Sequence, residues 1–285
     1  MQTDNTPQFG CVPPSEIARL AEEAAVGKTK KHPQVTFVLS VLAGIFISLA
    51  GMFYTIVTTG AEGLPYGMAK LIGGLSFSMG LMMVVLCGAE LFTSNTLLLM
   101  GRATRRLNIA QITKNWTLVY IGNMTGSFFM VAMLMAVGQY QGAHGDVGIN
   151  YMYIANAKMG HTFIQALLLG ILCNLVVCLT YWMTLSARSA AGKMFACMLP
   201  VAAFLAAGFE HSVANMFLLP MGFLIKSIAT PEFWEATGYS ADYFSNITIF
   251  NMIVMNLIPA TIGNIIGGGV MVGLSNWFVH LRERV

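Results

Sequence analysis

Residues 86–95 read Leu-Cys-Gly-Ala-Glu-Leu-Phe-Thr-Ser-Asn and place a carboxylate and several hydroxyl groups inside an otherwise apolar segment. A second stretch, residues 208–212, reads Gly-Phe-Glu-His-Ser and repeats the Gly-x-Glu pattern. Both lie in hydrophobic runs long enough to span a membrane. Ionisable groups at bilayer depth are costly and persist mainly where they line a cavity or satisfy exposed backbone groups. The pattern predicts two interrupted transmembrane helices, with breaks at Gly88 and Gly208, that face one pathway.

The composition predicts an integral membrane protein. Of the 285 residues, 56% are hydrophobic and only 9% are charged, and the mean hydropathy is +0.69. Soluble domains carry about 25% charged residues, so this chain lacks the polar surface of a soluble protein. Its length suits one compact bundle, and its net charge of +3 indicates no nucleic-acid partner.

The cysteines indicate no redox or metal chemistry. Four of the five lie in hydrophobic segments, and none has C-x-x-C spacing. These four are Cys87, Cys173, Cys178 and Cys197. We interpret them as buried small apolar residues, and we expect no disulfide, no metal and no cofactor.

The hydrophobic runs predict an all-α protein with six spans. They lie near residues 34–59, 66–100, 112–138, 162–185, 193–225 and 247–279. A straight crossing needs about 20 apolar residues, so the second and fifth runs are too long for one helix. Breaks at residues 88–95 and 208–215 account for the excess, and Pro200 and Pro220 flank the second break, as is typical of kinked half-helices. Polar loops are expected at residues 139–160 and 230–246.

The two halves of the chain repeat. The motif Asn-x6-Gly-Asn-x2-Gly begins at Asn115 in the third span and at Asn256 in the sixth, while Gly-x-Glu occurs in the second and fifth. Because each half holds three spans, an odd number, the halves must cross the bilayer in opposite directions. This is an inverted 3+3 repeat, whose interface normally carries the substrate site. The glycine spacing fits close helix packing at least as well as function.

Residues 1–33 are predicted to form a cytoplasmic tail with an amphipathic helix, followed by one transmembrane channel domain (34–280) and a short cytoplasmic tail (281–285). Ser15 can cap the tail helix and Gly27 can end it. The lysines that follow are typical of a helix on the membrane surface. Two interpretations remain open for this helix, a membrane-surface anchor and a movable plug.

The distribution of positive charge predicts that both termini are cytoplasmic. With the termini inside, all but three of the 15 Lys and Arg residues fall on the cytoplasmic side, as the positive-inside rule requires. The three exceptions are Lys70, Lys158 and Lys226.

The two breaks carry the residues that we expect to act. A broken helix frees backbone N–H and C=O groups that lipid cannot satisfy. Glu90 and Glu210 are placed to accept from those N–H groups or to lie near a half-helix N-terminus; direct contact with the permeant species is the alternative. His211 is the only histidine predicted at membrane depth. Imidazole can donate a hydrogen bond or a proton to an anion, whereas the alternative is a satisfied core histidine.

Further polar groups accompany this histidine. Thr93, at the matching break, supplies a hydroxyl that can orient the ring. The amides of Asn123, Asn174 and Asn264 either line the pathway or serve packing. No ring of carboxylates and no carbonyl-rich filter indicates a metal-cation route. An apolar path with one titratable histidine suits a small neutral molecule or a small monovalent anion.

Two motifs resemble the signatures of the formate/nitrite transporter family. They are residues 85–94, Val-Leu-Cys-Gly-Ala-Glu-Leu-Phe-Thr-Ser, and residues 170–178, Gly-Ile-Leu-Cys-Asn-Leu-Val-Val-Cys. The likeness covers nearly the whole chain, including residues 208–216 and 263–269. The resemblance implies an aquaporin-like subunit, a homopentamer with one pore per subunit, and passage of formate and related monovalent anions across the bacterial inner membrane.

The resemblance also assigns residues. By motif, the family's central histidine falls on His211 and its threonine partner on Thr93. Its apolar constrictions fall on Leu81, Leu91, Phe204 and Phe209. The family further implies that the N-terminal segment takes part in pH-dependent gating. Glu90 stands where relatives often have aspartate.

We therefore expect a pH-gated, pentameric, multi-pass inner-membrane channel for formate. One alternative is a nitrite channel of the same family. Another is a neutral-solute channel of the water or glycerol type, whose paired Asn-Pro-Ala motifs are absent from the sequence. A membrane enzyme is disfavoured, because Glu210-His211 lacks the second histidine of a zinc-protease helix and no serine stands in a Gly-x-Ser-x-Gly setting.

Overall fold

The computed structural model describes residues 10–282, and every regular element in that range is a helix. The predicted tail positions 1–9 and 283–285 lie outside the described residues. The helices, with the π-helical η5 and η6, are α1 (Pro14–Lys30), α2 (Pro33–Thr58), η1 (Ala61–Gly63), α3 (Tyr66–Leu86), α4 (Phe92–Asn95), α5 (Leu98–Ala103), α6 (Ile109–Ala136), η2 (Gln139–Gln141), η3 (Ala143–Gly145), α7 (Asp146–Met159), α8 (Phe163–Ser186), α9 (Ala190–Ala206), α10 (Ser212–Ile228), α11 (Pro231–Thr237), η4 (Ala241–Phe244), η5 (Asn251–Leu257), α12 (Ile258–Asn264), η6 (Ile265–Leu274) and α13 (Ser275–His280).

Five of the described helices are long and apolar enough to cross a membrane. They are α2, α3, α6, α8 and the continuous helix of η5, α12, η6 and α13 over Asn251–His280. α10 and α11 pass the same test only as a pair bent by 108°. α3 reaches this length by itself, with 21 residues. The chain is therefore a multi-pass, all-helical membrane protein.

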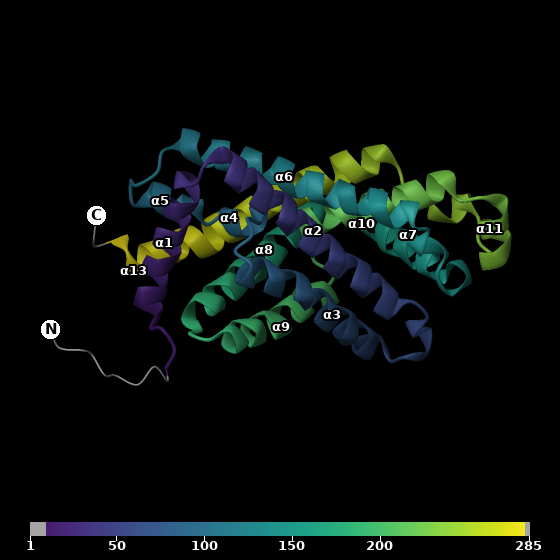
Figure 1. The fold of residues 1–285 in the computed structure, drawn as a ribbon, viewed down its shortest axis with the longest axis horizontal. Helices are drawn as coiled ribbons and strands as arrows, with labels where there is room; N and C mark the ends of the chain where they lie inside the picture. The colour runs from purple at the N-terminus through teal and green to yellow at the C-terminus, as the bar shows by residue number, and fades with distance from the viewer. Residues whose placement is uncertain (1–9, 283–285) are drawn as a thin grey trace.

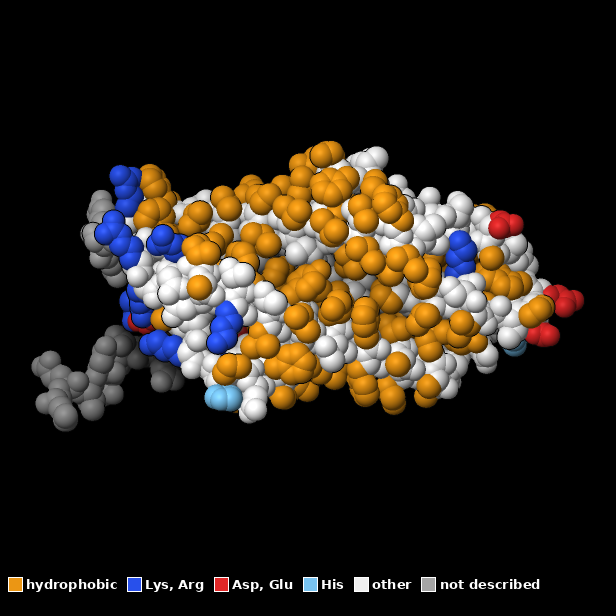
Figure 2. Space-filling view, turned by 90° about the horizontal axis from the view of Figure 1, so that it is seen from above, with side chains coloured by type: hydrophobic (Ala, Val, Ile, Leu, Met, Phe, Trp, Pro, Cys, Tyr) orange, Lys and Arg blue, Asp and Glu red, His pale blue; other side chains and the backbone are white. Residues whose placement is uncertain are grey.

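The helices form an elongated bundle with α1, α5 and α13 at one end and α11 at the other (Figure 1). Large apolar side chains, such as those of Val38, Phe128, Leu168 and Leu199, are exposed along its flank. In the view of Figure 2, Lys and Arg side chains gather mainly at the end that holds α1. The flank thus presents an apolar band between two polar ends, as a surrounding bilayer requires.

Small residues allow the long helices to approach closely. A Cβ atom at Gly126 of α6 would overlap the backbone carbonyl of Val41 in α2. In the other half, a Cβ at Gly267 of η6 would overlap the carbonyl of Ile171 in α8. These contacts support the packing interpretation of the repeated glycines.

The tail helix differs from the prediction at both ends. α1 begins at Pro14 with Pro13 at its N-cap, where Ser15 makes no cap bond, and it continues through Gly27 to Lys30. A glycine inside a helix costs about 1 kcal/mol relative to alanine. Packing offsets this cost, because α1 buries Ala18 and Ala21 against Leu97, Met100, Val272 and Leu281 at the end of the bundle.

Both loops predicted as irregular contain helices. The segment 139–160 includes α7, whose Tyr151, Met152 and Ala155 are fully buried, and α7 packs against α10. The segment 230–246 includes α11, which begins with Thr230 as its N-cap. These predictions were wrong because tertiary packing, not periodicity in a Gly- and Asn-rich segment, stabilises α7. The prediction of burial was also wrong for Cys87, which is exposed at the C-terminus of α3, whereas the other three membrane cysteines are buried.

Candidate functional site

Two short interruptions of the helices lie at the centre of the site. α3 ends at Leu86 and α4 begins at Phe92, while α9 ends at Ala206 and α10 begins at Ser212. Each interruption turns at a glycine with positive φ, 67° at Gly88 and 71° at Gly208. Glycine adopts this conformation without the steric penalty of a Cβ atom. Both glycines named from the sequence therefore mark the end of a helix.

Asparagine side chains satisfy the backbone groups that the interruptions free. Asn123 Oδ1 accepts from the Phe92 N–H (2.9 Å), and its Nδ2 donates to the carbonyls of Ser40 (2.8 Å) and Glu90 (2.9 Å). Both amide hydrogens of Asn123 are thus engaged with backbone.

Asn264 repeats this arrangement at the second interruption. Its Oδ1 accepts from the Ser212 N–H (2.9 Å), and its Nδ2 donates to the carbonyls of Gly170 (2.8 Å) and Glu210 (2.9 Å). The two asparagines therefore make the same three kinds of bond, each at its own interruption. In this structure the Asn264 amide is occupied by backbone rather than turned toward a cavity.

The two glutamates pair with lysine and asparagine side chains. Glu90, 1% exposed, contacts Lys31 (2.6 Å) and Lys28 (3.4 Å) of α1 and accepts from Asn95 Nδ2 (3.0 Å). Asn95 also donates to Asn115 Oδ1 and accepts from Lys28. The Glu90 carboxylate is therefore closed off by the N-terminal helix.

Glu210 has the corresponding environment in the second half. It is fully buried, contacts Lys158 of α7 (3.0 Å), and accepts from Asn215 Nδ2 (2.5 Å) and Asn256 Nδ2 (3.0 Å). His161 Nε2 lies 3.6 Å from the same carboxylate. Burying an unpaired carboxylate is costly, so a cation and amide donors are required at both glutamates.

Thr93 and His211 meet between the two interruptions. Thr93 Oγ1 lies 3.1 Å from His211 Nε2, and both residues are buried. His211 is the N-cap of α10, and its Nδ1 accepts from the Ala214 N–H (3.1 Å). Because a backbone N–H can only donate, Nδ1 carries no proton, and the proton of the neutral ring is on Nε2. Nε2 then donates to Thr93 Oγ1, which leaves the Thr93 hydroxyl hydrogen free for another acceptor.

Apolar side chains surround this pair. The Phe204 ring stacks on the His211 ring with centroids 6.0 Å apart and an interplanar angle of 22°. Leu91 is fully buried and immediately precedes α4. Asn174 of α8 lies beside Thr93 and donates from Nδ2 to the Thr93 carbonyl (3.1 Å) and to the Asn264 carbonyl (2.6 Å).

Two cavities reach toward the pair from opposite ends of the bundle. One, of about 360 Å³, is lined by Leu81, Gly88 and Glu90 together with Lys28 of α1 and Lys31, the C-cap of that helix. The other, of about 650 Å³, is lined by Gly208, Phe209, Glu210, Lys158 and His161, among others. Thr93, His211, Leu91 and Phe204 line neither cavity. Ser94, next to Thr93, lines the first cavity, and Glu210, next to His211, lines the second, so the pair is adjacent in sequence to residues of both.

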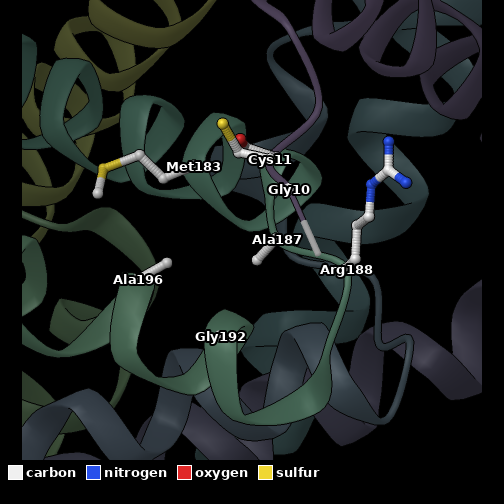
Figure 3. A pocket seen from close by; sticks show the side chains of 8 residues that line it. Gly10, Cys11, Met183, Ala187, Arg188, Gly192 and Ala196 are labelled. Carbon is white, nitrogen blue, oxygen red and sulfur yellow. The ribbon is translucent and has the colours of Figure 1, made fainter. Parts of the chain in front are cut away.

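A third cavity, of about 330 Å³, lies apart from both interruptions. Figure 3 shows it between the segment that holds Cys11 and the turn from α8 to α9, with Arg188 and Met183 at its edge. It shares no lining residue with the other two cavities. We place the functional site at the interruptions, where buried polar groups converge.

Sequence reasoning placed the glutamates, the histidine and the threonine but missed several of their partners. It missed the lysines that pair with the carboxylates. It also missed Asn95 and Asn215, each of which donates to one glutamate and to an asparagine of another helix. A signal existed for both asparagines, since each stands five residues after a Gly-x-Glu glutamate. Lys158 was also visible as one of three cations on the opposite side.

The chain resembles proteins of known activity over its whole length. It is 50% identical over 283 residues to the formate channel FocA of Escherichia coli (strain K12), covering 99% of each sequence. It is 42% identical over 261 residues to the formate channel FocA of Haemophilus influenzae, covering 92% of each. The solved structure of a pentameric formate channel with formate bound matches with a TM-score of 0.83 and 47% identity, over 87% of this chain and 98% of that one. Residues 15–278 also match the family profile described as formate/nitrite transporter. The chain belongs to the formate/nitrite transporter family.

Proposed function

We propose that the protein is a channel that passes formate and related small monovalent anions across the bacterial inner membrane, with no enzymatic activity. The observation that carries this proposal is the buried Thr93–His211 hydrogen bond, which lies between two cavities at opposite ends of the bundle. The relatives named as formate channels support formate over nitrite. The family is one of transporters.

His211 acts through Thr93 as a hydrogen-bond donor. Removing water from an anion costs several kcal/mol even after the protein relaxes, and a hydrogen bond to a charged group contributes about 1.5–3 kcal/mol. The neutral ring donates from Nε2 to Thr93, whose hydroxyl then donates to the carboxylate of the permeant. This chain of donors polarises the hydroxyl toward the anion.

The geometry favours hydrogen-bond donation over proton donation. A ring protonated at both nitrogens would lose the bond from the Ala214 N–H and would place a positive charge at the N-terminus of α10. A cation at that end of a helix is unfavourable. We therefore assign to His211 the hydrogen-bonding role of the two predicted from the sequence.

Apolar constrictions flank the pair. Leu81 borders the first cavity and Phe209 the second, while Leu91 and Phe204 lie buried between them. Hydrophobic constrictions exclude water and hydrated ions by dewetting. An anion that exchanges its water for the hydroxyl of Thr93 crosses where a fully hydrated ion does not.

We propose that the channel domain, residues 34–280, is an aquaporin-like inverted 3+3 repeat. In it α3 with α4 and α5, and α9 with α10, form the two broken spans. Support comes from the equivalent bonding of Asn123 and Asn264 to the backbone, and of Asn95 and Asn215 to their glutamates. Two halves related in this way normally hold the substrate site at their interface.

We further propose a homopentamer with cytoplasmic termini and a pH-dependent gate formed by α1. The pentamer rests on the solved relative, and the orientation on the concentration of Lys and Arg at the end that holds α1. Lys28 of α1 and Lys31, which follows α1 as its C-cap, line the first cavity, so release of this segment would open that cavity. This supports the plug interpretation of the tail helix over the surface anchor.

The test is formate flux into proteoliposomes at pH 7 and pH 5, beside nitrite and chloride. We expect pH-responsive formate flux in the wild type. The substitution His211→Phe should change this flux by at least about tenfold, because it removes the hydrogen bond that polarises the Thr93 hydroxyl toward the charged permeant. His280→Phe, in the last helix, is the matched control. Equal flux and an equal pH response in His211→Phe would refute the role of the histidine; passage of nitrite but not formate would refute the substrate.

A further inference from the structure

The main-chain carbonyl of Thr93 has an unusual set of partners. Its oxygen accepts from Thr96 Oγ1 (2.7 Å), Asn174 Nδ2 (3.1 Å) and Cys178 Sγ (3.4 Å). α4 is only four residues long, and the N–H of Leu97 bonds to Ser94 rather than to Thr93. The carbonyl thus lacks the partner that a continuing helix supplies. Side chains from a second helix replace it.

Asn174 and Cys178 donate to the Thr93 carbonyl from one face of α8. They stand four residues apart, so their side chains lie one above the other. Both are fully buried. Cys178 Sγ also lies 3.6 Å from Thr96 Oγ1 and 3.7 Å from Asn174 Oδ1. The thiol therefore lies inside a polar cluster, although the sequence indicated only a small apolar residue.

The backbone of η6 closes the cluster on its other side. A Cβ atom at Gly268 would overlap Thr96 Oγ1, Asn174 Nδ2 and Cys178 Sγ. We call Thr96, Asn174, Cys178 and Gly268 the Thr93 cradle. Three elements that are distant in sequence thus enclose one carbonyl oxygen.

We propose that Asn174 and Cys178 are positioning residues that set the Thr93 hydroxyl against His211 by holding the Thr93 carbonyl. The hydroxyl and the carbonyl belong to one residue of a single-turn helix. Holding the carbonyl holds the backbone of Thr93 and so the direction of the Cα–Cβ bond, from which the few allowed rotamers of threonine place the hydroxyl. The Thr93–His211 distance of 3.1 Å depends on that direction. This inference rests on the proposed role of Thr93 and His211 in anion passage.

A thiol suits this place. Cysteine behaves as a small hydrophobic residue with a weak donor, so it can be buried at low cost and still bond to the carbonyl. Cys173, on the same helix, provides a matched comparison. Both cysteines are fully buried and each belongs to an apolar cluster, but within the described residues Cys173 makes no side-chain hydrogen bond, whereas Cys178 does.

The experiment measures formate flux, as KM and maximal rate per reconstituted pentamer, for Cys178→Ala, Cys178→Ser and Cys173→Ala. Each is made in the wild type and in a Thr93→Ala background, and thermal stability is recorded for all. We expect Cys178→Ala to lower the maximal rate about 2- to 10-fold, the range of one hydrogen bond. Cys178→Ser, which restores a donor, and Cys173→Ala should stay within about twofold of the wild type.

The Thr93→Ala background separates positioning from packing. If Cys178 acts through the Thr93 hydroxyl, Cys178→Ala should cause no further loss of flux once that hydroxyl is gone. Losses that multiply in the double variant, or an equal loss in Cys178→Ser, would overturn the inference and leave Cys178 a packing residue. If Cys178→Ala does not assemble, Cys178→Val, which fills the space without donating, takes its place. Failure of both to assemble while Cys178→Ser assembles would also overturn it.

The outcomes distinguish this inference from the proposed function. Wild-type flux of formate with unchanged flux in Thr93→Ala would refute the role of the Thr93–His211 pair, and the cradle inference with it. A large loss in Thr93→Ala with full flux in Cys178→Ala would refute the cradle alone.

Discussion

Replacing Asn264 by alanine should destabilise the protein far more than an ordinary polar substitution. Its side chain bonds to three backbone groups, the Ser212 N–H and the carbonyls of Glu210 and Gly170. Gly170 lies inside α8 and keeps its helical partner. Ser212 is the first residue of α10, where the N–H has no helical partner, and Glu210 lies in the interruption, so the substitution leaves one buried N–H and one buried C=O unpaired.

The expected loss follows from those two groups. Each buried polar group left unpaired costs about 1–3 kcal/mol, which gives a loss of about 2–6 kcal/mol in the free energy of unfolding. The equivalent substitution, Asn123→Ala, strands the Phe92 N–H and the Glu90 carbonyl, and it should lose a similar amount. The control is Asn251→Ala, which removes a single bond to a partly buried carbonyl.

The assay is reversible unfolding in mixed micelles with increasing SDS, followed by circular dichroism. We expect both asparagine variants to unfold at clearly lower SDS than the wild type and the control variant. A loss below about 1 kcal/mol in Asn264→Ala, accompanied by a large change in formate flux, would refute this reasoning. It would instead make Asn264 a direct ligand of the permeant.

Two further predictions concern packing and the N-terminal helix. The substitution Gly267→Ala should lower the free energy of unfolding in detergent by about 1–3 kcal/mol or prevent assembly, because the added Cβ atom would overlap the Ile171 carbonyl. An unchanged free energy of unfolding would contradict the close approach of η6 and α8. Replacing both Lys28 and Lys31 by methionine should speed hydrogen exchange in α1, because Glu90 loses the cations that attach α1 to it. The single variant Lys30→Met, at an exposed position of α1, should exchange like the wild type, and equal rates in all three proteins would refute this attachment.

The sequence predicted those features that depend on local chemistry. Glycines at positions 88 and 208 inside long apolar runs indicated helix ends, and both adopt the positive φ that other residues avoid. α2, α6, α8 and the helix over Asn251–His280 begin and end within a few residues of the predicted spans, because hydrophobicity and length largely decide where a chain enters lipid. α3 ends at Leu86, well before the predicted end of the second span. The motifs around Glu90 and His211 likewise drew attention to residues that the structure buries; their role in the site stays a prediction.

Features that depend on contacts between distant segments could not be predicted in this way. Nothing local indicates that Asn264 bonds to Ser212 or that Cys178 bonds to the Thr93 carbonyl, because these bonds join residues on different helices. α7 was missed for the same reason: its helix depends on burial of Tyr151 and Met152 by neighbouring segments. Gly27 did not end α1, because the packing of the helix outweighed local propensity.

The position of α1 has a consequence for biosynthesis. Ala18 and Ala21 are synthesised before Val272 and Leu281, against which they pack. At a translation rate of about 5–20 residues per second, on the order of 10–50 s separates the synthesis of the two surfaces. During that interval α1 can pack on earlier residues such as Leu97 and Met100, but the part of its docking surface formed by Val272 and Leu281 does not exist. The spans before Asn251 are therefore synthesised while α1 lacks part of the surface that holds it in the finished fold.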